Sequence, residues 1–260
     1  MNRVQLFLRL LAIQRVLVRH GVDELLADTE LLGAARLLFR LNPASWGRRP
    51  VEGPRGERIR RALEDLGPIF VKFGQAVSTR QDLLPPDVGR ELAKLQDEVP
   101  PFPAELALAE VEASYGAPAE TVFASFDREA LAAASIAQVH AATLHSGEDV
   151  VVKLLRPRVR QLIQQDLEVM YTVARLAWRW WPEARRLRPV EVVREYEKTI
   201  LNELDLLREA TNAAQLRRNW QGSPLIYVPK IYFDYCRPSV LVMERIRGIP
   251  IDDMEAGLRR

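Results

Sequence analysis

A lysine and a glutamine interrupt an otherwise apolar segment at residues 69–80, which holds the first candidates for chemistry. Four residues spaced at i, i+3, i+4 and i+7 share one helical face: Lys72, Gln75, Ala76 and Thr79. Another face is apolar and carries Phe70, Phe73 and Val77. Because a buried ammonium group is costly without an acidic partner, we expect Lys72 to meet a carboxylate from elsewhere in the chain. The alternative is an amphipathic helix on which Lys72 is solvated.

A second lysine, Lys153, ends a run of valines at residues 150–152. Branched side chains favour a strand there, and a strand lysine that faces a cleft can neutralise phosphate oxygens as a point charge. The preceding segment, 131–138, is rich in alanine, which permits fairly close approach of a backbone to a phosphate but excludes most positive-φ conformations. The alternatives are an ordinary edge-strand lysine and a turn of small residues that leads into a strand.

The elements that must position these residues are predicted from periodicity and from breakers. Helices are expected at residues 4–18, 57–66, 68–80, 87–97, 104–115, 159–181 and 189–220, with Asp87 as a helix cap. Strands are expected at residues 137–144, 150–154, 227–233 and 240–243. A linker rich in proline, glycine and arginine is expected at residues 42–56. The pattern therefore predicts a helical first part and a mixed second part.

Composition argues against several classes of function. The 260 residues are 48% hydrophobic and 28% charged, as expected of one large folded domain or two small ones. A formal net charge of +2 gives no support for wholesale binding of nucleic acid. The single Cys236 excludes an internal disulfide, and so few cysteines and histidines argue against a structural zinc site. Neither a bilayer-spanning apolar run nor a secretory signal is expected.

The expected N-terminal helix at residues 4–18 is amphipathic and basic. Its apolar face carries Leu6, Leu10, Ile13 and Leu17. The opposite face carries Arg9, Arg15 and Arg19. Such a helix can lie in a membrane interface or pack on the protein's own core, and the sequence leaves both open.

The motif Lys72-Phe73-Gly74-Gln75, followed by residues 78–86, resembles the Lys-x-Gly-Gln region of the UbiB family. These are atypical protein-kinase-like proteins of ubiquinone biosynthesis. Five further blocks follow in the family's order, at residues 132–140, 150–157, 194–198, 202–210 and 242–250. One block could arise by chance, but five in order make the resemblance specific.

The resemblance implies an α+β fold, in which a helical N-terminal extension leads into a protein-kinase-like N-lobe with a small antiparallel sheet and long helices. The implied domains are residues 1–56, with amphipathic helices and the linker; 57–122, with the Lys-x-Gly-Gln motif; and 123–260, an N-lobe that ends just after the hinge. The Lys72 helix is expected to lie across the nucleotide cleft, which argues against a plain protein kinase.

The resemblance also implies a nucleotide site. An alanine-rich loop replaces the kinase glycine-rich loop, Lys153 contacts phosphates and pairs with a helix glutamate, and the segment around Met243 is the hinge. The implied nucleotide-binding residues are Leu131, Ala132, Ala133, Ala134, Ser135, Ile136, Ala137, Gln138, Lys153, Glu209, Met243 and Glu244. The implied cofactors are ATP and Mg²⁺, with the metal ligands expected in a C-lobe beyond the hinge.

A regulatory set follows from the same resemblance: Lys72, Gln75, Glu203 and Asp205. Glu203 and Asp205 resemble the ends of the family's Glu-x-Asp motif, which implies that they meet Lys72. Glu209 is then expected to pair with Lys153, although the choice between Glu203 and Glu209 stays open. All three acids are expected on one long helix, and the alternative is a solvated acidic face with Arg208 as a partner.

No catalytic residue is expected in this chain. No histidine follows His145, so a His-x-Asp catalytic loop cannot follow the hinge, and Asp252 and Asp253 come too soon after it. We therefore expect the N-terminal part of a longer protein, inactive alone and without a metal site of its own.

The expected function is that of an ATP-binding, kinase-like protein that supports ubiquinone biosynthesis by ATPase-coupled action or by regulating biosynthetic enzymes at a membrane. The expected partners are those enzymes or lipid precursors and the membrane surface, without nucleic acid; a homodimer stays open. The expected location is the cytoplasmic face of a bacterial inner membrane, with this part peripheral. The alternative is a non-catalytic membrane- or lipid-binding scaffold or regulator.

Overall fold

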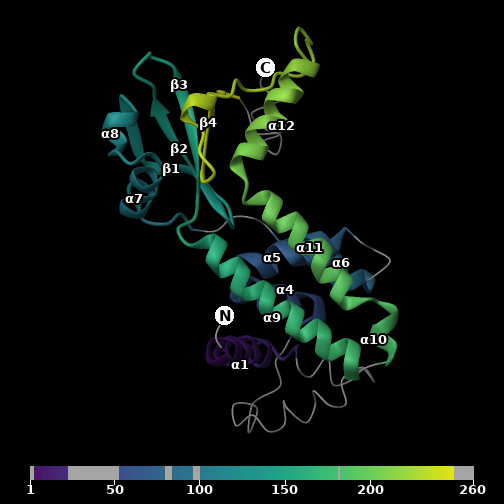
Figure 1. Ribbon diagram of the computed structural model, residues 1–260. Coiled ribbons are helices and arrows are strands. Elements are labelled where there is room, and N and C mark those ends of the chain that lie inside the picture. Colours follow the sequence, from purple (N-terminus) through teal and green to yellow (C-terminus); the bar gives the residue numbers. More distant parts are fainter. Residues whose placement is uncertain (1–2, 23–52, 80–83, 96–99, 181, 249–260) are drawn as a thin grey trace. The chain divides into compact units, whose positions relative to one another are not determined.

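The computed structural model describes residues 3–22, 53–79, 84–95, 100–180 and 182–248, which fall into two compact units (Figure 1). The first unit groups Met1–Val99, Ala134–Ile136 and Arg158–Asn202, and the second groups Pro100–Ala133, Ala137–Pro157 and Glu203–Arg260. The predicted linker lies largely outside the described residues, and Asp252 and Asp253 lie wholly outside them.

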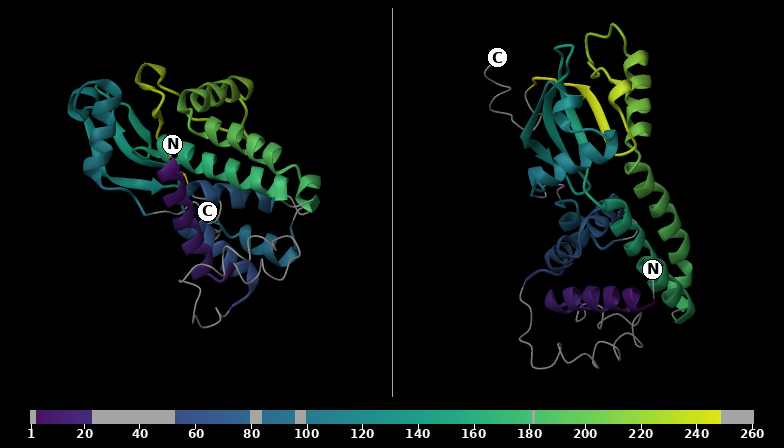
Figure 2. Two further views of the ribbon diagram at one scale, coloured as in Figure 1. Left: turned by 60° about the horizontal axis from the view of Figure 1, so that its bottom comes forward. Right: turned by 60° about the vertical axis from the view of Figure 1, so that its left-hand side comes forward.

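The first unit is helical. Its described helices are α1 (Arg3–Arg19), α4 (Arg55–Leu66), α5 (Pro68–Ser78), α6 (Pro86–Leu92), α9 (Val159–Trp180), α10 (Pro182–Arg186) and α11 (Pro189–Glu203). Helices α4, α5 and α6 pack on one another around a small apolar cluster that includes Val71, Val88 and Leu92. Helices α9 and α11 run side by side in every view (Figures 1 and 2).

The observed bounds and N-cap of α6 differ from the predicted helix at 87–97. Helix α6 ends at Leu92, and its N-cap position is held by Pro85 rather than by Asp87. Pro86 at the first helical position favours this start, because proline loses no helical hydrogen bond there. Asp87 lies in the first turn, where its carboxylate accepts two hydrogen bonds from Arg55 at 2.6 and 2.7 Å. The Arg55 guanidinium holds the pKa of that carboxyl at about 2.

Gly56 allows the backbone of α4 to pack closely against the backbone of α6. A Cβ atom at Gly56 would lie 2.8 Å from the backbone oxygen of Asp87 and 2.9 Å from Cγ of Glu91. By contrast, a Cβ atom at Gly89 on α6 would meet nothing within 4 Å. Close packing therefore requires glycine at position 56 but not at position 89, so Gly89 can serve as the control for Gly56.

We expect Gly56→Ala to lower the free energy of unfolding by about 1–3 kcal/mol, because backbone atoms must move to admit the methyl group. Gly89→Ala should instead raise it by about 0.5–1 kcal/mol, since alanine is the better helix former. Urea unfolding of the two variants and the parent measures both effects. Equal changes of the same sign would contradict the packing of α4 on α6.

The second unit is built on an antiparallel sheet. Its elements are α7 (Ala104–Tyr115), α8 (Ala119–Val122), β1 (Ser125–Ala133), β2 (Ala137–Thr143), β3 (Asp149–Leu155), α12 (Leu206–Asn219), a 3-10 turn (Phe233–Tyr235) and β4 (Val240–Glu244). The strand order is β1-β2-β3-β4, with every neighbouring pair antiparallel. The predicted α+β fold class is confirmed.

The sheet buries one face against α7. The core on this face includes Ala107, Val111, Phe123, Val150, Val152, Leu154, Val240 and Val242. Because successive strand residues point to opposite faces, Lys153 between Val152 and Leu154 points away from this core. The pleat of β3 thus presents Lys153 on the face opposite α7.

Two further predicted elements differ from the structure. The helix predicted at 189–220 is two helices, α11 and α12, with a break at Leu204 and Asp205. The strand predicted at 227–233 forms no regular strand: it has one isolated bridge, between Ile231 and Met243, and runs into the 3-10 turn at Phe233. Pro229 lies inside that segment and has no backbone N–H to donate, which limits its pairing.

Candidate nucleotide-binding site

Lys153 on β3 and Glu209 on α12 form an ion pair within the second unit. The Lys153 ammonium donates to both carboxylate oxygens of Glu209, with Nζ 2.8 Å from each. The side chains are 25% and 43% exposed, so the pair is partly screened from water yet open to a ligand. Of the two glutamates considered, Glu209 is therefore the partner of Lys153, as the resemblance implied.

The break between α11 and α12 positions Glu209. Asp205 stands at the N-cap of α12, where its side chain accepts a hydrogen bond from the backbone N–H of Arg208 at 3.1 Å. Glu209 consequently lies in the first turn, where a helix favours negative charge. Leu206 and Ala210 are fully buried and hold this turn in place. The predicted single helix is wrong because Asp205 starts a new one.

The alanine-rich segment closes the β1–β2 hairpin. Ala132 and Ala133 end β1 beside Val139 and Gln138, and Ala137 begins β2. The three residues between the strands, Ala134–Ile136, group with the first unit, and Ser135 is fully buried. Leu131 is exposed. The nucleotide-binding role of this segment stays a prediction.

The sequence did not predict a buried network of hydrogen bonds that is centred on β2. Gln138 accepts a hydrogen bond from the Phe102 N–H at 2.9 Å, and its Nε2 lies 2.7 Å from Nε2 of His140. Nδ1 of His140 lies 2.8 Å from the backbone oxygen of Asp127. This network assigns the proton of neutral His140 to Nδ1. Because the Gln138 side chain is engaged here, a nucleotide contact from this residue would use its backbone.

Burial is the main cause that lowers the pKa of His140 below its ordinary value of 6.5, against the smaller opposing effect of Asp127. The unfolded chain therefore binds the His140 proton more readily than the folded chain does. The stability that comes from keeping His140 neutral is complete above pH 6.5 and is lost as the pH falls below it.

We accordingly expect His140→Gln to flatten the rise of unfolding free energy between pH 5 and pH 7. Urea titrations of the variant and the parent at several pH values measure this slope. An unchanged slope for His140→Gln would show that His140 is not a buried neutral imidazole.

The backbone of the predicted hinge is already hydrogen-bonded. Glu244 N–H donates to the Lys230 oxygen at 2.8 Å, and Arg245 N–H donates to the Asp149 oxygen at 3.2 Å. Met243 pairs with Val151 across the sheet. An adenine edge at Met243 and Glu244 would have to compete with these bonds, and this contact stays a prediction.

The Lys-x-Gly-Gln motif has a structural role inside the first unit. Gln75 donates to the Leu95 oxygen at 3.0 Å and so satisfies a carbonyl just beyond α6. A Cβ atom at Gly74 would lie 2.5 Å from Cδ1 of Leu95 and 2.7 Å from Cδ1 of Leu63, so both leucine side chains would have to shift to admit a larger residue. Lys72 belongs to the first unit and Glu203 to the second, and their pairing stays a prediction.

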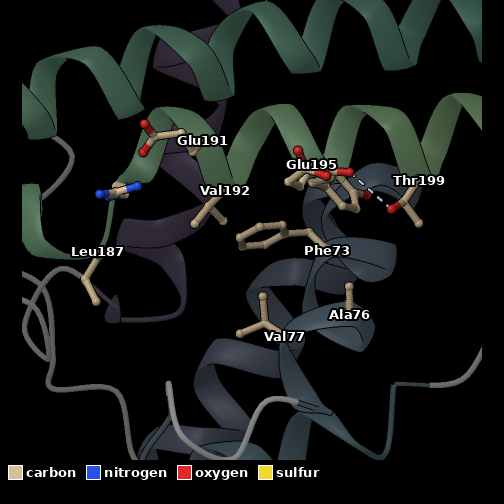
Figure 3. A pocket seen from close by; sticks show the side chains of 10 residues that line it. Phe73, Ala76, Val77, Leu187, Glu191, Val192, Glu195 and Thr199 are labelled. Carbon is tan, nitrogen blue, oxygen red and sulfur yellow. Dashed lines mark hydrogen bonds between the residues drawn. The ribbon is translucent and has the colours of Figure 1, made fainter.

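The apolar face of α5 lines a groove against α11 (Figure 3). The groove holds about 460 Å³ and is walled by Phe73, Val77 and Val192, with Glu191 and Glu195 from α11 at its edge (Figure 3). Phe73 meets the ring of Tyr196 edge-on at 5.2 Å, and the Tyr196 hydroxyl donates to the Ile69 oxygen at 2.5 Å. The apolar face of α5 that the spacing of Phe73 and Val77 predicted is therefore only partly covered by α11.

Comparison with known proteins places these residues in a family. Residues 94–259 match the ABC1 atypical kinase-like domain. The chain is 60% identical over 251 residues to a "Probable protein kinase UbiB" of Pseudomonas paraeruginosa, and 58% identical over 250 residues to one of Azotobacter vinelandii. These matches cover 96% and 95% of the chain and 47% of each relative, so the chain spans about half the length of these curated relatives.

A solved structure supports the same conclusion. The Mycobacterium tuberculosis protein Rv3197, in its complex with erythromycin, has a TM-score of 0.51 and 30% sequence identity to the chain. The match covers 69% of this chain and 45% of that protein. The matched domain spans β1 to β4 and includes both Lys153 and Glu209. The chain belongs to the ABC1 family of atypical kinase-like proteins, as its resemblance to UbiB proteins predicted.

Proposed function

We propose that this chain supplies the N-lobe half of an ATP site in a kinase-like protein that supports ubiquinone biosynthesis, by ATPase-coupled action or by regulating biosynthetic enzymes. One observation carries the proposal: the half-exposed ion pair between Lys153 and Glu209. The same pairing of a strand lysine with a helix glutamate positions the lysine on the nucleotide phosphates of protein kinases.

The described residues fit ATP better than they fit its metal ion. A lysine ammonium that keeps one carboxylate partner can still direct its charge to phosphate oxygens. Within the described ranges, no group of three or more His, Cys, Asp or Glu side chains could hold a metal ion. We therefore assign Lys153 to the phosphates and assign no Mg²⁺ ligand.

Thermal unfolding of a full-length protein that carries this chain tests the proposal. We expect ATP with Mg²⁺ to raise the melting temperature of the parent, because a ligand that binds only the folded state stabilises it. The shift should be much smaller in Lys153→Ala and should persist in Lys198→Ala, which removes a surface lysine paired with Glu195 on α11. Equal shifts in all three proteins would refute the assignment of Lys153.

A scaffold at a membrane is the second candidate, and α1 favours it. Val4, Phe7 and Leu8 form an apolar stripe at i, i+3 and i+4 that is 58–61% exposed. Among the described residues no helix has the length and apolar character to cross a bilayer. Contact through α1 would thus be peripheral, in keeping with our proposals of a membrane surface, lipid precursors and biosynthetic enzymes as partners at the inner face.

Co-sedimentation with anionic liposomes separates this candidate from the first. We expect Phe7→Asp with Leu8→Asp to release the protein from the liposomes, because charges on the stripe oppose burial among acyl chains. Leu162→Asp with Leu176→Asp changes two exposed leucines on α9 and should leave sedimentation as in the parent. Unchanged sedimentation of the α1 variant would remove the membrane role of this helix.

A further inference from the structure

Helix α12 is anchored to the sheet at both of its ends. Its first turn carries Glu209, which pairs with Lys153 on β3. Its last turn carries Arg217, whose guanidinium donates to the Val228 oxygen and lies 3.7 Å from a carboxylate oxygen of Glu244 on β4. Figure 1 shows α12 in green running beside the sheet that holds both anchors.

The second anchor is a compact cluster rather than a loose surface pair. The Tyr227 hydroxyl lies 2.7 Å from each oxygen of the Glu244 carboxylate and donates to it, and the Lys230 N–H donates to the same group at 3.0 Å. Arg217 also stacks over the Tyr227 ring, 5.3 Å from its centroid. These hydrogen bonds, with that of Tyr227 foremost, hold the pKa of Glu244 below its ordinary value, so the carboxylate stays charged.

The two anchors are separated by a similar distance along α12 and along the sheet. Glu209 and Arg217 are eight residues apart, which is about 12 Å along a helix and less than a quarter turn around it. On the sheet Glu244 pairs with Val150, three residues from Lys153, which is about 10 Å along a strand. The structure holds both anchors at once. Because Leu206 and Ala210 bury only the beginning of α12, we expect the loss of the Arg217 anchor to loosen the far end of the helix and, through it, the position of Glu209.

We propose that Arg217 is a positioning residue for the nucleotide site: by fixing the far end of α12 to the hinge strand at Glu244, it keeps Glu209 on Lys153. The inference rests on the proposed function, because its effect is read as nucleotide affinity. It also links the hinge to the phosphate-binding lysine through one rigid helix. The side chain of Glu244 then acts as an anchor, and any adenine contact at this residue falls to its backbone.

A double-mutant cycle in a full-length protein that carries this chain tests the role of Arg217. We expect Arg217→Met to weaken MgATP affinity about fivefold and to have no further effect when combined with Glu209→Gln, because Arg217 acts through Glu209. Arg217→Lys should restore part of the affinity, since it keeps the charge near Glu244. Arg218→Met is the matched control and should bind as the parent does, because the Arg218 side chain hydrogen-bonds to Gln215 on its own helix.

Two results would overturn the proposal: parental affinity in Arg217→Met, or an equal loss whether or not Glu209 is present. If Arg217→Met fails to fold, Tyr227→Phe gives the same reading, because it removes only the hydroxyl bonded to Glu244. It should then weaken affinity only when Glu209 is present. Failure of the proposed function is distinguishable, because Lys153→Ala would then leave nucleotide affinity unchanged whatever Arg217 does.

Discussion

Replacing Arg9 with methionine should lower the free energy of unfolding by about 3 kcal/mol, the largest effect on stability that we expect from one substitution. Arg9 on α1 donates to both carboxylate oxygens of Asp166 on α9, at 2.6 and 2.9 Å, and to the last carbonyl of α4 at Leu66. The side chain of Asp166 is only 8% exposed. Without Arg9 the Asp166 carboxylate would stay buried but lose its charged partner, and burying an unpaired charge is costly.

The chain offers a matched control in Arg55→Met. Arg55 and Asp87 have the same two-pronged geometry, at 2.6 and 2.7 Å, but their side chains are 51% and 42% exposed. We expect this variant to lose much less stability than Arg9→Met does, because water replaces the partner. Arg9→Met with Asp166→Leu should recover most of the loss. Equal losses for the two single variants would contradict the burial of Asp166, and with it the packing of α1 on α9.

The second large effect concerns nucleotide affinity. We expect Lys153→Ala to weaken MgATP binding about 30-fold in a full-length protein that carries this chain, which corresponds to about 2 kcal/mol. Two electrostatic effects weaken binding in this variant. It loses the attraction of the ammonium group for phosphate, and the unpaired Glu209 carboxylate repels phosphate. Adding Glu209→Gln should therefore recover part of the affinity. Isothermal titration measures each dissociation constant.

Lys230→Ala is the control for that series, because Lys230 belongs to the same unit and sits over the Tyr232 ring, 4.6 Å from its centroid. It should bind MgATP as the parent does. A dissociation constant for Lys153→Ala within twofold of the parent would contradict a phosphate-binding role.

Local pattern was enough to predict most helices. Gly67 and Pro68 predicted the start of α5, and the run after Pro103 predicted α7 with its observed bounds. Valine at residues 150–152 likewise predicted β3. These elements follow from residues that are close in sequence, so periodicity and breakers suffice to find them.

The break at Asp205 had a local signal that the periodicity concealed. An aspartate directly before Leu206 is a typical N-cap, yet the apolar pattern runs on through it and suggested one helix. Pro229 was a similar warning against a strand at 227–233. In both cases one residue with a specific backbone role outweighed the average pattern of its neighbours.

The site itself depended on contacts across long stretches of chain. Lys153 and Glu209 are 56 residues apart, and neither periodicity nor composition could pair them without the family resemblance. Gln138 and His140 could be placed on one strand face by their spacing, but their partners Phe102 and Asp127 lie on other segments. Tertiary structure alone brought these groups together.

The central claim is that Lys153, held by Glu209, lines the nucleotide phosphate site. Lysine acetylation of a full-length protein that carries this chain, read residue by residue by mass spectrometry, tests it most directly. We expect MgATP to slow acetylation of Lys153 at least fivefold and to leave Lys198 and Lys230 unchanged, because bound phosphates cover the ammonium. Acetylation of Lys153 at the same rate with and without saturating MgATP would contradict the claim.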